Sequence, residues 1–385
     1  MDVLSFVVLA VHIWYNSAAG ETSRRKDGVA LATGDRFGGS RNDDGAMNST
    51  NWSIVGHEWA VQLLQSSLDS GRLPHAILIT GDSQVGKRTL ALALASAINC
   101  QRDDRPCGRC RSCTKIAHGT HPDVRLVEAD SSERGRAGQL KIEQIRDLQR
   151  FASLAPMESP FKVIILREFE QATLPAANAL LKTLEEPPPQ VRLVLTSARP
   201  DALLPTIVSR CQTIQLRPVP LGQIKEALVE RWLARPQQAD LLARLSQGRI
   251  GWAVERLTDN AAWDDRERRL QDARQLPEQG AVDRLAYAEG LSRKAGDLQP
   301  TLAAWTSWWR DVLLAQHGCA THVTNVDLAA EIDEAARHYT ASDVRGFLAR
   351  LEQAPDHLNR NVNSRLLLET LLLHMPAPAA TSNHL

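Results

Sequence analysis

The sequence predicts an α/β domain with a parallel sheet, followed by an all-helical region. Three observations lead to this prediction. Short apolar runs alternate with amphipathic stretches from about residue 75 to 217, the order found in βαβ units. A glycine-containing loop separates the first apolar run from an Ala/Leu-rich helix, which is how such a sheet begins. After Pro218 and Pro220 the pattern becomes helical throughout.

The strands are expected at the apolar runs, because each is bounded by Gly, Pro or polar residues. They cover residues 75–80, 123–129, 161–166 and 191–197, and a fifth begins at Cys211, a small residue that we expect to be buried. Helices are expected between and before these runs, at residues 51–70, 89–99, 140–153 and 171–186. In the third helix, four apolar positions lie on one face: Ile142, Ile145, Leu148 and Phe151.

The helical remainder begins with about three short helices in residues 221–258. A polar segment follows near residues 259–266, and a longer helical region then runs to about residue 375. This last region contains a tryptophan cluster at helical spacing, which we interpret as core or subunit interface: Trp305, Trp308 and Trp309.

Length and charge limit the possible functions. The chain has 385 residues, 43% of them apolar, so we expect two or three domains with a substantial core. The 45 Lys and Arg balance the 45 Asp and Glu. This balance argues against a protein that binds nucleic acid over its whole surface, because the phosphate backbone favours a basic face. It still permits a local basic strip, or DNA held by an assembly that contains this chain.

The first 50 residues differ from the rest. Residues 1–20 contain an apolar run, but no Lys or Arg precedes it and Asp2 is acidic, so the pattern of a signal peptide is incomplete. The run is also shorter than the ~20 apolar residues of a membrane span. Residues 21–50 are polar and aperiodic. We therefore expect residues 1–50 to be a disordered extension, or the start codon to be assigned too early, with Met47 near the true start. We expect the protein to be cytoplasmic and to have no membrane contact.

The segment GDSQVGKRT, from Gly81 to Thr89, is a P-loop with one departure. Glycines let backbone N–H groups surround a phosphate at a helix N-terminus, and Lys87 reaches the β- and γ-phosphates. Arg88 stands where Ser or Thr would hold Mg²⁺, and Thr89 comes one place later, about 100° further around the helix. ATP or ADP binding without hydrolysis therefore stays open. The candidate residues of this degenerate site are Gly81, Gly86, Lys87 and Thr89.

A working P-loop ATPase also needs an acidic residue at the end of an apolar strand, to hold Mg²⁺. The strand KVIIL is followed by Arg167 and then by Glu168, which remains as a degenerate acidic strand end. The guanidinium of Arg167 competes with a metal ion, since both are cations in a confined site. Two independent departures around the Mg²⁺ position predict that hydrolysis is lost.

A cysteine cluster follows the P-loop helix within fourteen residues: Cys100, Cys107, Cys110 and Cys113. Four thiolates complete a tetrahedral shell, which Zn²⁺ prefers, and they leave no open coordination position. Buried free cysteines are the weaker alternative, because the segment is polar and rich in arginine. The spacing therefore predicts a structural zinc site in a reducing compartment. We expect His118 and His121 to be surface or hydrogen-bonded histidines, not ligands.

Taken in order, four motifs resemble the bacterial clamp-loader branch of the AAA+ ATPases: the P-loop, the four cysteines, ALLKTLEEPP at Ala179–Pro188, and Ser209-Arg210-Cys211. The resemblance is close over residues 54 to about 217 and covers the helical remainder in outline. The motor subunits of this branch (gamma/tau) keep an intact P-loop and an acidic strand end. The departures at Arg88 and Arg167 resemble the delta-prime subunits instead. Gly251 is a third departure, at a place where motor subunits carry a lid arginine.

The resemblance implies a domain division. It places an AAA+ domain at 51–217 with an inserted zinc knuckle at 100–113, a helical lid at 218–262 and a helical collar at 263–375, with 1–50 as extension and 376–385 as tail. It also implies partners: delta and gamma/tau subunits in a hetero-pentamer that loads the sliding clamp on primed DNA. Any DNA-directed DNA polymerase activity, a nucleotidyl transfer, would then belong to the holoenzyme.

The resemblance further implies that Arg210 acts as an arginine finger in trans, on the γ-phosphate of a neighbouring motor subunit. A guanidinium suits this role because it is permanently charged. Without the resemblance, Arg210 would be interpreted as a surface arginine in a loop. Thr196 and Ser197 match the polar sensor position of the family, where we expect a structural role. Glu185 and Glu186 form a solvated helix end, at a face that the family uses for partners.

Two other functions remain open. In the first, the chain is an active motor-type ATPase in which Thr89 and Glu168 replace the missing ligands. In the second, it is a zinc-ribbon nucleic-acid-binding protein whose arginines near Cys107–Cys113 contact phosphate. ATP turnover by the isolated chain would favour the first function, and salt-sensitive DNA binding abolished by chelation would favour the second.

Overall fold

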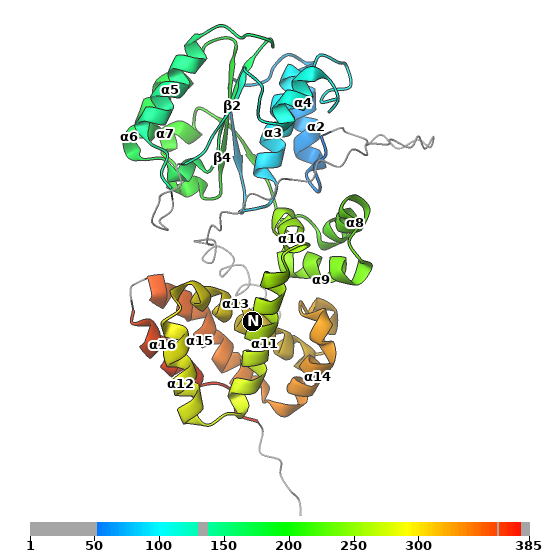
Figure 1. The fold of residues 1–385 in the computed structure, drawn as a ribbon, viewed down its shortest axis with the longest axis vertical. Helices are drawn as coiled ribbons and strands as arrows, with labels where there is room; N and C mark the ends of the chain where they lie inside the picture. Colours follow the sequence, from blue (N-terminus) through cyan, green and yellow to red (C-terminus); the bar gives the residue numbers. More distant parts are fainter. Residues whose placement is uncertain (1–51, 130–137, 360–361, 379–385) are drawn as a thin grey trace, which may run out of the picture. The chain divides into compact units, whose positions relative to one another are not determined.

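The computed structural model describes residues 52–129, 138–359 and 362–378. The chain divides into two compact units, the first ending at Pro220 and the second beginning at Leu221 (Figure 1). The predictions for residues 1–50, and for the tail from residue 379 onward, lie outside the described residues. Among the helices described, none is both long enough and apolar enough to cross a bilayer.

The first unit contains a five-stranded parallel sheet in the order β2-β3-β4-β1-β5. The strands lie where the apolar runs predicted them, with trimmed ends in every strand except β4. Both faces of β1 and β3, which flank the central strand β4, are buried, which explains their continuous apolar sequence. The bounds are Ala76–Thr80 for β1, Val124–Val127 for β2, Lys162–Leu166 for β3, Val191–Ser197 for β4 and Gln212–Gln215 for β5.

Helices cover both faces of this sheet, with α5 and α6 on one side and α2, α3 and α4 on the other (Figure 1). Alternate residues of each strand serve the two layers: Ile77 and Ile79 of β1 pack under α2 and α3, whereas Leu78 packs under α5 and α6. The helices are α2 (Glu58–Asp69), α3 (Lys87–Asn99), α4 (Arg111–Ala117), α5 (Ile142–Ser153), α6 (Leu174–Glu185) and α7 (Pro205–Val208), with short 3₁₀ turns η1 (Phe169–Gln171) and η2 (Pro200–Ala202).

The predicted start of the first helix, at residue 51, is wrong. Helix α2 begins at Glu58, because Ser53 and Gly56 have φ angles of 53° and 80°, in the left-handed region that an α-helix excludes. Trp52 instead lies in the core, 2% exposed, where its indole N–H donates to Gln65. The predicted burial of Cys211 is also only partly right, because this residue is half-buried.

The second unit is helical throughout its described part. Three short helices come first, as predicted: α8 (Leu221–Trp232), α9 (Pro236–Ser246) and α10 (Ile250–Arg256). The polar segment near 259–266 is the exposed beginning of α11, which Asp259 caps by accepting a hydrogen bond from the N–H of Ala262. The remaining helices are α11 (Asn260–Gln275), α12 (Ala281–Ser292), α13 (Ala295–Gln316), α14 (Ala329–His338), α15 (Ala341–Asn359) and α16 (Ser364–Leu373), with 3₁₀ turns η3 (Leu276–Glu278), η4 (Ala320–His322) and η5 (Val326–Leu328).

The tryptophan cluster of α13 forms the core of this unit. Trp305, Trp308 and Trp309 are each at most 2% exposed. The ring of Trp309 meets Tyr339 and Phe347 edge-on, with centroids 5.0 and 5.8 Å away. Of the two environments predicted for these residues, the structure shows the core.

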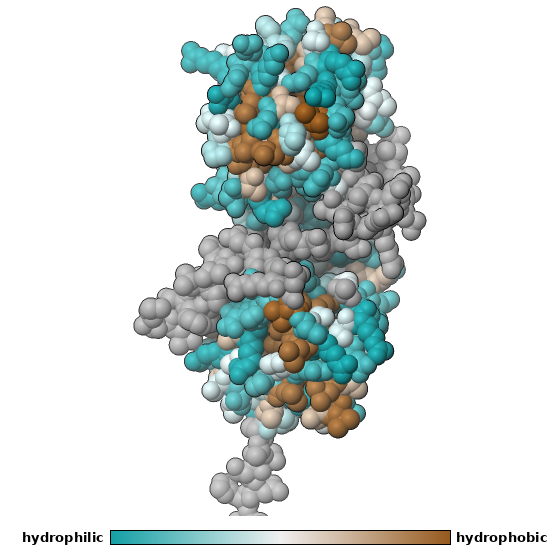
Figure 2. All heavy atoms as spheres, turned by 90° about the vertical axis from the view of Figure 1, so that its left-hand side faces the viewer, coloured by the Kyte–Doolittle hydropathy of each residue, from teal (hydrophilic) through white to brown (hydrophobic). Residues whose placement is uncertain are grey.

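Apolar side chains also reach the surface of each unit (Figure 2). Leu154, Met157 and Leu174 are exposed in the first unit, and Val282 and Leu366 in the second. Single exposed apolar residues are ordinary on protein surfaces. They therefore do not locate the functional site, which we derive from the polar groups at the ends of the strands.

Candidate nucleotide site and metal centre

The P-loop connects the end of β1 to α3, and its glycines are needed for its shape. Gly81 and Gly86 have φ angles of 138° and 117°. A Cβ at Gly81 would lie 2.5 Å from the carbonyl oxygen of Leu216, which follows the neighbouring strand β5. The loop therefore keeps the backbone that lets N–H groups at the start of α3 point toward an anion.

Lys87 is the first residue of α3 and is only 7% exposed. Its Nζ donates to the carbonyl oxygens of Gly81 and Asp82, both at 2.6 Å. Burial lowers the pKa of Lys87 to about 8, against the opposing influence of nearby carboxylates, Glu170 foremost. The predicted phosphate-binding lysine therefore lies over the loop.

The two arginines that depart from the ATPase pattern meet at one carboxylate. Arg167, after β3, lies 3.2 Å from Oε1 of Glu128, which follows β2. Arg88, on α3, lies 4.0 Å from the same oxygen. A second nitrogen of Arg167 lies 3.2 Å from Oε1 of Glu168. Arg88 and Arg167 are 79 positions apart in the sequence, and the fold brings both side chains to the same carboxylate.

Thr89 and Glu168, the candidates to replace the missing Mg²⁺ ligands, have different environments. Thr89 is exposed, on a different side of α3 from the buried Lys87. Oε2 of Glu168 accepts a hydrogen bond from Gln171 at 2.7 Å, while its other oxygen faces Arg167. Glu168 itself has a φ of 49°, so its backbone turns sharply at the end of β3.

The sensor-position residues connect the ends of β3 and β4. Oγ1 of Thr196 accepts a hydrogen bond from the N–H of Glu168 at 3.0 Å. The Ser197 hydroxyl accepts one from the N–H of Arg199. Glu170 accepts the N–H of Ala198 through one carboxylate oxygen. These bonds give both hydroxyls backbone partners and hold the two strand ends at a defined distance.

His57 is a residue near the loop that the sequence did not reveal. It is 1% exposed, and its Nε2 lies 3.0 Å from the carbonyl oxygen of Val85, inside the P-loop. Burial lowers its pKa, so the neutral ring is favoured. No spacing rule points to this histidine, because it precedes α2 and lies 28 residues from the loop that it supports.

Arg210 lies just after α7, with its side chain 36% exposed. One guanidinium nitrogen lies 2.8 Å from Oε1 of Glu185, the last residue of α6, and another donates to the carbonyl oxygen of Thr206 at 3.0 Å. The fold thus joins two motifs, ALLKTLEEPP and Ser209-Arg210-Cys211, that the sequence showed only as separate segments. Sequence reasoning placed Glu185 at a solvated helix end and missed this contact.

The four cysteines of the predicted zinc site lie together. Their sulfur atoms are all within 4.8 Å of one another, and the sulfurs of Cys100 and Cys110 are 4.0 Å apart. A tetrahedral zinc site with bonds of about 2.3 Å has sulfurs about 3.8 Å apart, so the four residues fit such an ion. The backbone N–H groups of Cys110 and Cys113 donate to the sulfurs of Cys107 and Cys110 respectively. The cluster can therefore hold a metal ion.

The thiols of the cluster differ in ionisation, because burial raises the pKa of Cys100 and of Cys113 whereas the pKa of Cys110 is lowered. Burial by itself raises the pKa of this thiol, but hydrogen bonds from the backbone of Cys113 and Gln101 outweigh it, and the pKa falls to about 6. The thiolate is the form that binds a metal ion.

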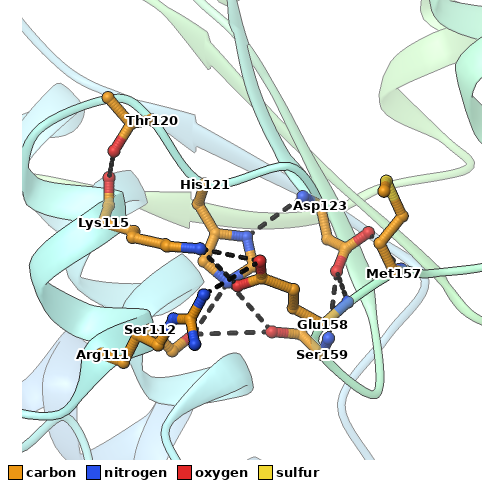
Figure 3. A network of polar contacts seen from close by, with 9 residues as sticks. All are labelled: Arg111, Ser112, Lys115, Thr120, His121, Asp123, Met157, Glu158 and Ser159. Carbon is orange, nitrogen blue, oxygen red and sulfur yellow. Dashed lines mark hydrogen bonds and ion pairs between the residues drawn. The ribbon is translucent and has the colours of Figure 1, made fainter.

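A polar network fastens α4, which carries Cys113, to the segment before β3 (Figure 3). The buried carboxylate of Asp123 accepts the backbone N–H groups of Met157, Glu158 and Ser159. His121 is 4% exposed, and its Nε2 lies within 3.0 Å of the hydroxyls of Ser112 and Ser159, while Lys115 pairs with Glu158. His121 is therefore a hydrogen-bonded histidine, as predicted. His118 is exposed and bonds to the carbonyl oxygen of Thr114.

Comparison with known proteins connects these features to a family. Residues 56–220 match the family model described as DNA polymerase III, delta subunit, and residues 260–376 match DNA polymerase III, delta subunit, C terminal. The chain is 31% identical to DNA polymerase III subunit delta-prime of Bacillus subtilis over 318 residues, which are 81% of this chain and 94% of that protein. The chain belongs to the family of DNA polymerase III delta-prime subunits.

Another member of the delta-prime family, from Escherichia coli, is 32% identical over 332 residues, covering 81% of this chain and 92% of that protein. The tau subunit of the same organism is 36% identical over 215 residues, which are 54% of this chain and 32% of that protein. Similarity to these two delta-prime subunits therefore extends along most of both chains, whereas similarity to this tau subunit covers only a part of each.

Proposed function

We propose that this chain is a clamp-loader subunit that does not hydrolyse ATP and that lends Arg210 to the ATP site of a neighbouring subunit. Its parts would be an AAA+ domain (51–217), a lid (218–262) and a collar (263–375). The observation that carries the proposal is the meeting of Arg88 and Arg167 at one oxygen of Glu128.

This meeting bears on hydrolysis because a P-loop ATPase holds Mg²⁺ at the P-loop Ser/Thr and a strand-end carboxylate. Here the first ligand is replaced by Arg88, and the carboxylates of Glu128 and Glu168 both face Arg167. A divalent cation would have to displace one guanidinium and approach another. Both effects oppose its binding, so the chain's own site is unsuited to hydrolysis.

The position of Arg210 supports a role toward a neighbour. Its guanidinium has five N–H donors, and the contacts with Glu185 and Thr206 use two of its nitrogens. The side chain stays more than one-third exposed. A fixed, permanently charged and accessible guanidinium can neutralise charge that develops on a transferred phosphoryl group.

The proposal includes a structural zinc ion held by the four cysteines. When bound, Zn²⁺ would supply a crosslink between the end of α3 and the segment that follows it. Cys100 is the residue that follows α3, and Cys110 caps α4 by accepting the N–H of Cys113. The cysteines would thus hold α4 against the P-loop helix, away from the phosphate site itself.

The proposed partners are a delta subunit and gamma/tau motor subunits in a hetero-pentamer that places a sliding clamp on primed DNA in the cytoplasm. Polymerase activity would belong to the holoenzyme. The support for these partners is membership of the delta-prime family.

The test is the DNA- and clamp-stimulated ATPase of a reconstituted loader that contains either the original chain or Arg210→Ala. An arginine finger supplied in trans is worth roughly 10³-fold or more at the adjoining site. Total turnover should fall to the level of the remaining sites, while Arg217→Ala, an exposed arginine after β5, should leave it unchanged. ATP hydrolysis by the isolated chain, with no effect of Arg210→Ala, would replace the proposal with the active-motor function.

A further inference from the structure

Strand β2 forms one edge of the sheet, because the strand order is β2-β3-β4-β1-β5. It lies between the layer of α5 and the layer of α3 and α4 (Figure 1). We propose that this edge binds an extended segment of a partner protein in which apolar and acidic residues alternate, and that the segment adds to the sheet as a further strand. Neither ATP hydrolysis nor the role of Arg210 enters this inference, which goes beyond the proposed function.

The backbone of β2 leaves hydrogen-bonding groups at this edge. The carbonyl oxygen of Asp123, just before β2, accepts the N–H of Val163 on β3. Alternate residues of a parallel strand bond to the same neighbour, so Val124 and Leu126 face the opposite way, outward. The N–H of Val124 donates to the carbonyl oxygen of His121. Within the described residues, no hydrogen bond uses the two outward carbonyl oxygens or the N–H of Leu126. These three groups can bond to an added strand.

A groove of about 440 Å³ lies between β2 and the helices α3 and α4. None of the described residues that line it is acidic. Arg88, at one wall, has 55% of its side chain exposed and lies 4.0 Å from its carboxylate neighbour Glu128. Apolar side chains of an added strand can enter this groove, because much of its lining is apolar. The apolar lining includes Leu92, Ile116, Val124 and Leu126.

Arg125 gives the other face of the edge its charge. Its side chain is exposed, and its guanidinium carbon lies 4.2 Å from the centre of the Phe151 ring on α5. The ammonium group of Lys162 lies 4.1 Å from the same ring centre. Among the residues that the structure describes, no carboxylate lies at ion-pair distance from Arg125, and the buried Asp123 accepts three backbone N–H groups instead. Two cations at one ring favour an acidic partner on this face.

The two faces together specify the pattern of the segment. Residues of an added strand point alternately to the two faces of the sheet. Those beside Val124 and Leu126 face the apolar groove, and those beside Arg125 face the cations. A segment in which apolar and acidic residues alternate matches both faces. A nucleic acid matches only the charge, because its phosphates would meet the outward carbonyl oxygens.

The experiment uses fluorescence anisotropy of a labelled five-residue peptide, Glu-Val-Glu-Val-Glu with blocked ends, titrated with the full-length chain. Binding should saturate, and Lys-Val-Lys-Val-Lys should bind at least about tenfold more weakly, because its charges repel Arg125. Absence of binding at millimolar concentration, or equal binding of the two peptides, overturns the proposal.

Peptides with methylated backbone nitrogens test the strand geometry without altering the protein. Methylation at the Val residues removes the N–H groups that face β2 in antiparallel addition, and methylation at the Glu residues removes those that face it in parallel addition. At least one of the two peptides should bind about tenfold more weakly, since two or more hydrogen bonds are lost. If neither binds more weakly, the peptide does not extend the sheet and the proposal is wrong.

Variants locate the binding. Arg125→Glu should weaken it about tenfold, whereas Arg146→Glu, at an exposed arginine on α5, is the matched control and should bind normally. Leu126→Pro removes the outward N–H without touching a bond to β3 and should also weaken binding, with unchanged circular dichroism as evidence of folding. Equal binding by Arg125→Glu and Arg146→Glu places the peptide elsewhere and overturns the proposal.

A single-stranded oligothymidylate of twelve residues tests the other class of partner. It should not displace the peptide. Displacement that Arg125→Glu abolishes would identify nucleic acid as the occupant of this edge and would replace the proposal. The result is separable from the proposed function, because Arg210→Ala should leave peptide binding unchanged: Arg210 contacts Glu185 and Thr206, not β2.

Discussion

Two regions of the first unit pair arginine with glutamate in different arrangements. At the ends of β2 and β3, Arg88 and Arg167 converge on Glu128, and Arg167 also faces Glu168. After α7, Arg210 meets the single carboxylate of Glu185 together with a carbonyl oxygen. In the first region two arginines share one carboxylate. In the second, one carboxylate contacts one arginine whose side chain stays 36% exposed.

The difference shows that a contact between arginine and glutamate does not by itself identify a function. Exposed pairs of this kind contribute little to stability, typically 0–1 kcal/mol. Their importance depends on what else the two groups could bind. Four experiments test whether the first region binds ADP without hydrolysis, whether the cysteines hold a metal ion, and whether Arg210 acts in trans.

The largest effect is expected for Arg210→Lys. Lysine keeps the charge but loses the planar fork and the reach of the guanidinium, so turnover at the adjoining site should fall by about 10²-fold or more. The measurement is clamp-stimulated ATPase of the reconstituted loader. The turnover that remains with Arg210→Ala is subtracted to give the adjoining site alone. Turnover at that site within twofold of the original would mean that charge alone is enough, and the comparison of the two regions would lose its geometric basis.

Loss of a cysteine should lower the metal content of the chain and leave the role of Arg210 unchanged. Cys110→Ser removes one of four sulfur ligands, and zinc affinity should fall by more than the roughly 10–100-fold of a change outside the ligand shell. Cys211→Ser, outside the cluster, is the control. Metal content per chain measures the effect. The effect of Arg210 on the loader should persist, because Arg210 contacts Glu185 and Thr206 and not the cysteine segment.

The pH dependence of ADP binding should reveal whether Lys87 contacts the phosphates of the ligand. Its pKa is lowered to about 8, so the protein is charged at this residue below pH 8 and must take up a proton to bind above it. Affinity should therefore fall about fivefold between pH 8 and pH 9, by linkage. An unshifted lysine would hold its charge to above pH 10. The charged groups that act on Lys87 are Glu170, Glu168, Asp82 and Arg167.

Titration of ADP at half-unit steps from pH 7.5 to 9.5 measures this effect. A flat profile would mean that Lys87 does not contact the ligand, and the Lys87→Met variant should itself show no pH dependence in this range.

The smallest effect is expected for Glu185→Gln. Glutamine keeps an oxygen that accepts a hydrogen bond but loses the charge that helps to hold Arg210. Turnover at the adjoining site should fall about threefold to tenfold, which corresponds to about 0.7–1.4 kcal/mol. Glu186→Gln, the neighbouring residue without a contact to Arg210, is the matched control. If both variants change turnover equally, the contact with Glu185 does not position Arg210.

Much of the architecture could be predicted from the sequence, because the signals are local. Continuous apolar runs such as KVIIL and VRLVLTS indicate strands buried on both faces, and β4 has the bounds that its run predicts. The cysteine spacing indicated a cluster, and four sulfurs within 4.8 Å confirm that the residues meet. The boundary of α2 was wrong, because the periodicity of its apolar residues does not reveal a positive φ at Ser53.

The sequence by itself determined which chemical groups are present: the glycines and lysine of a phosphate loop, the two arginines at the metal positions, and four thiols at zinc spacing. Only the tertiary structure decided which groups meet. Glu128 joins Arg88 to Arg167, Glu185 holds Arg210, and His57 supports the loop from a distant segment. The physical reason is that spacing determines neighbours within a helix or strand, whereas contacts between strand ends depend on the order of strands in the sheet.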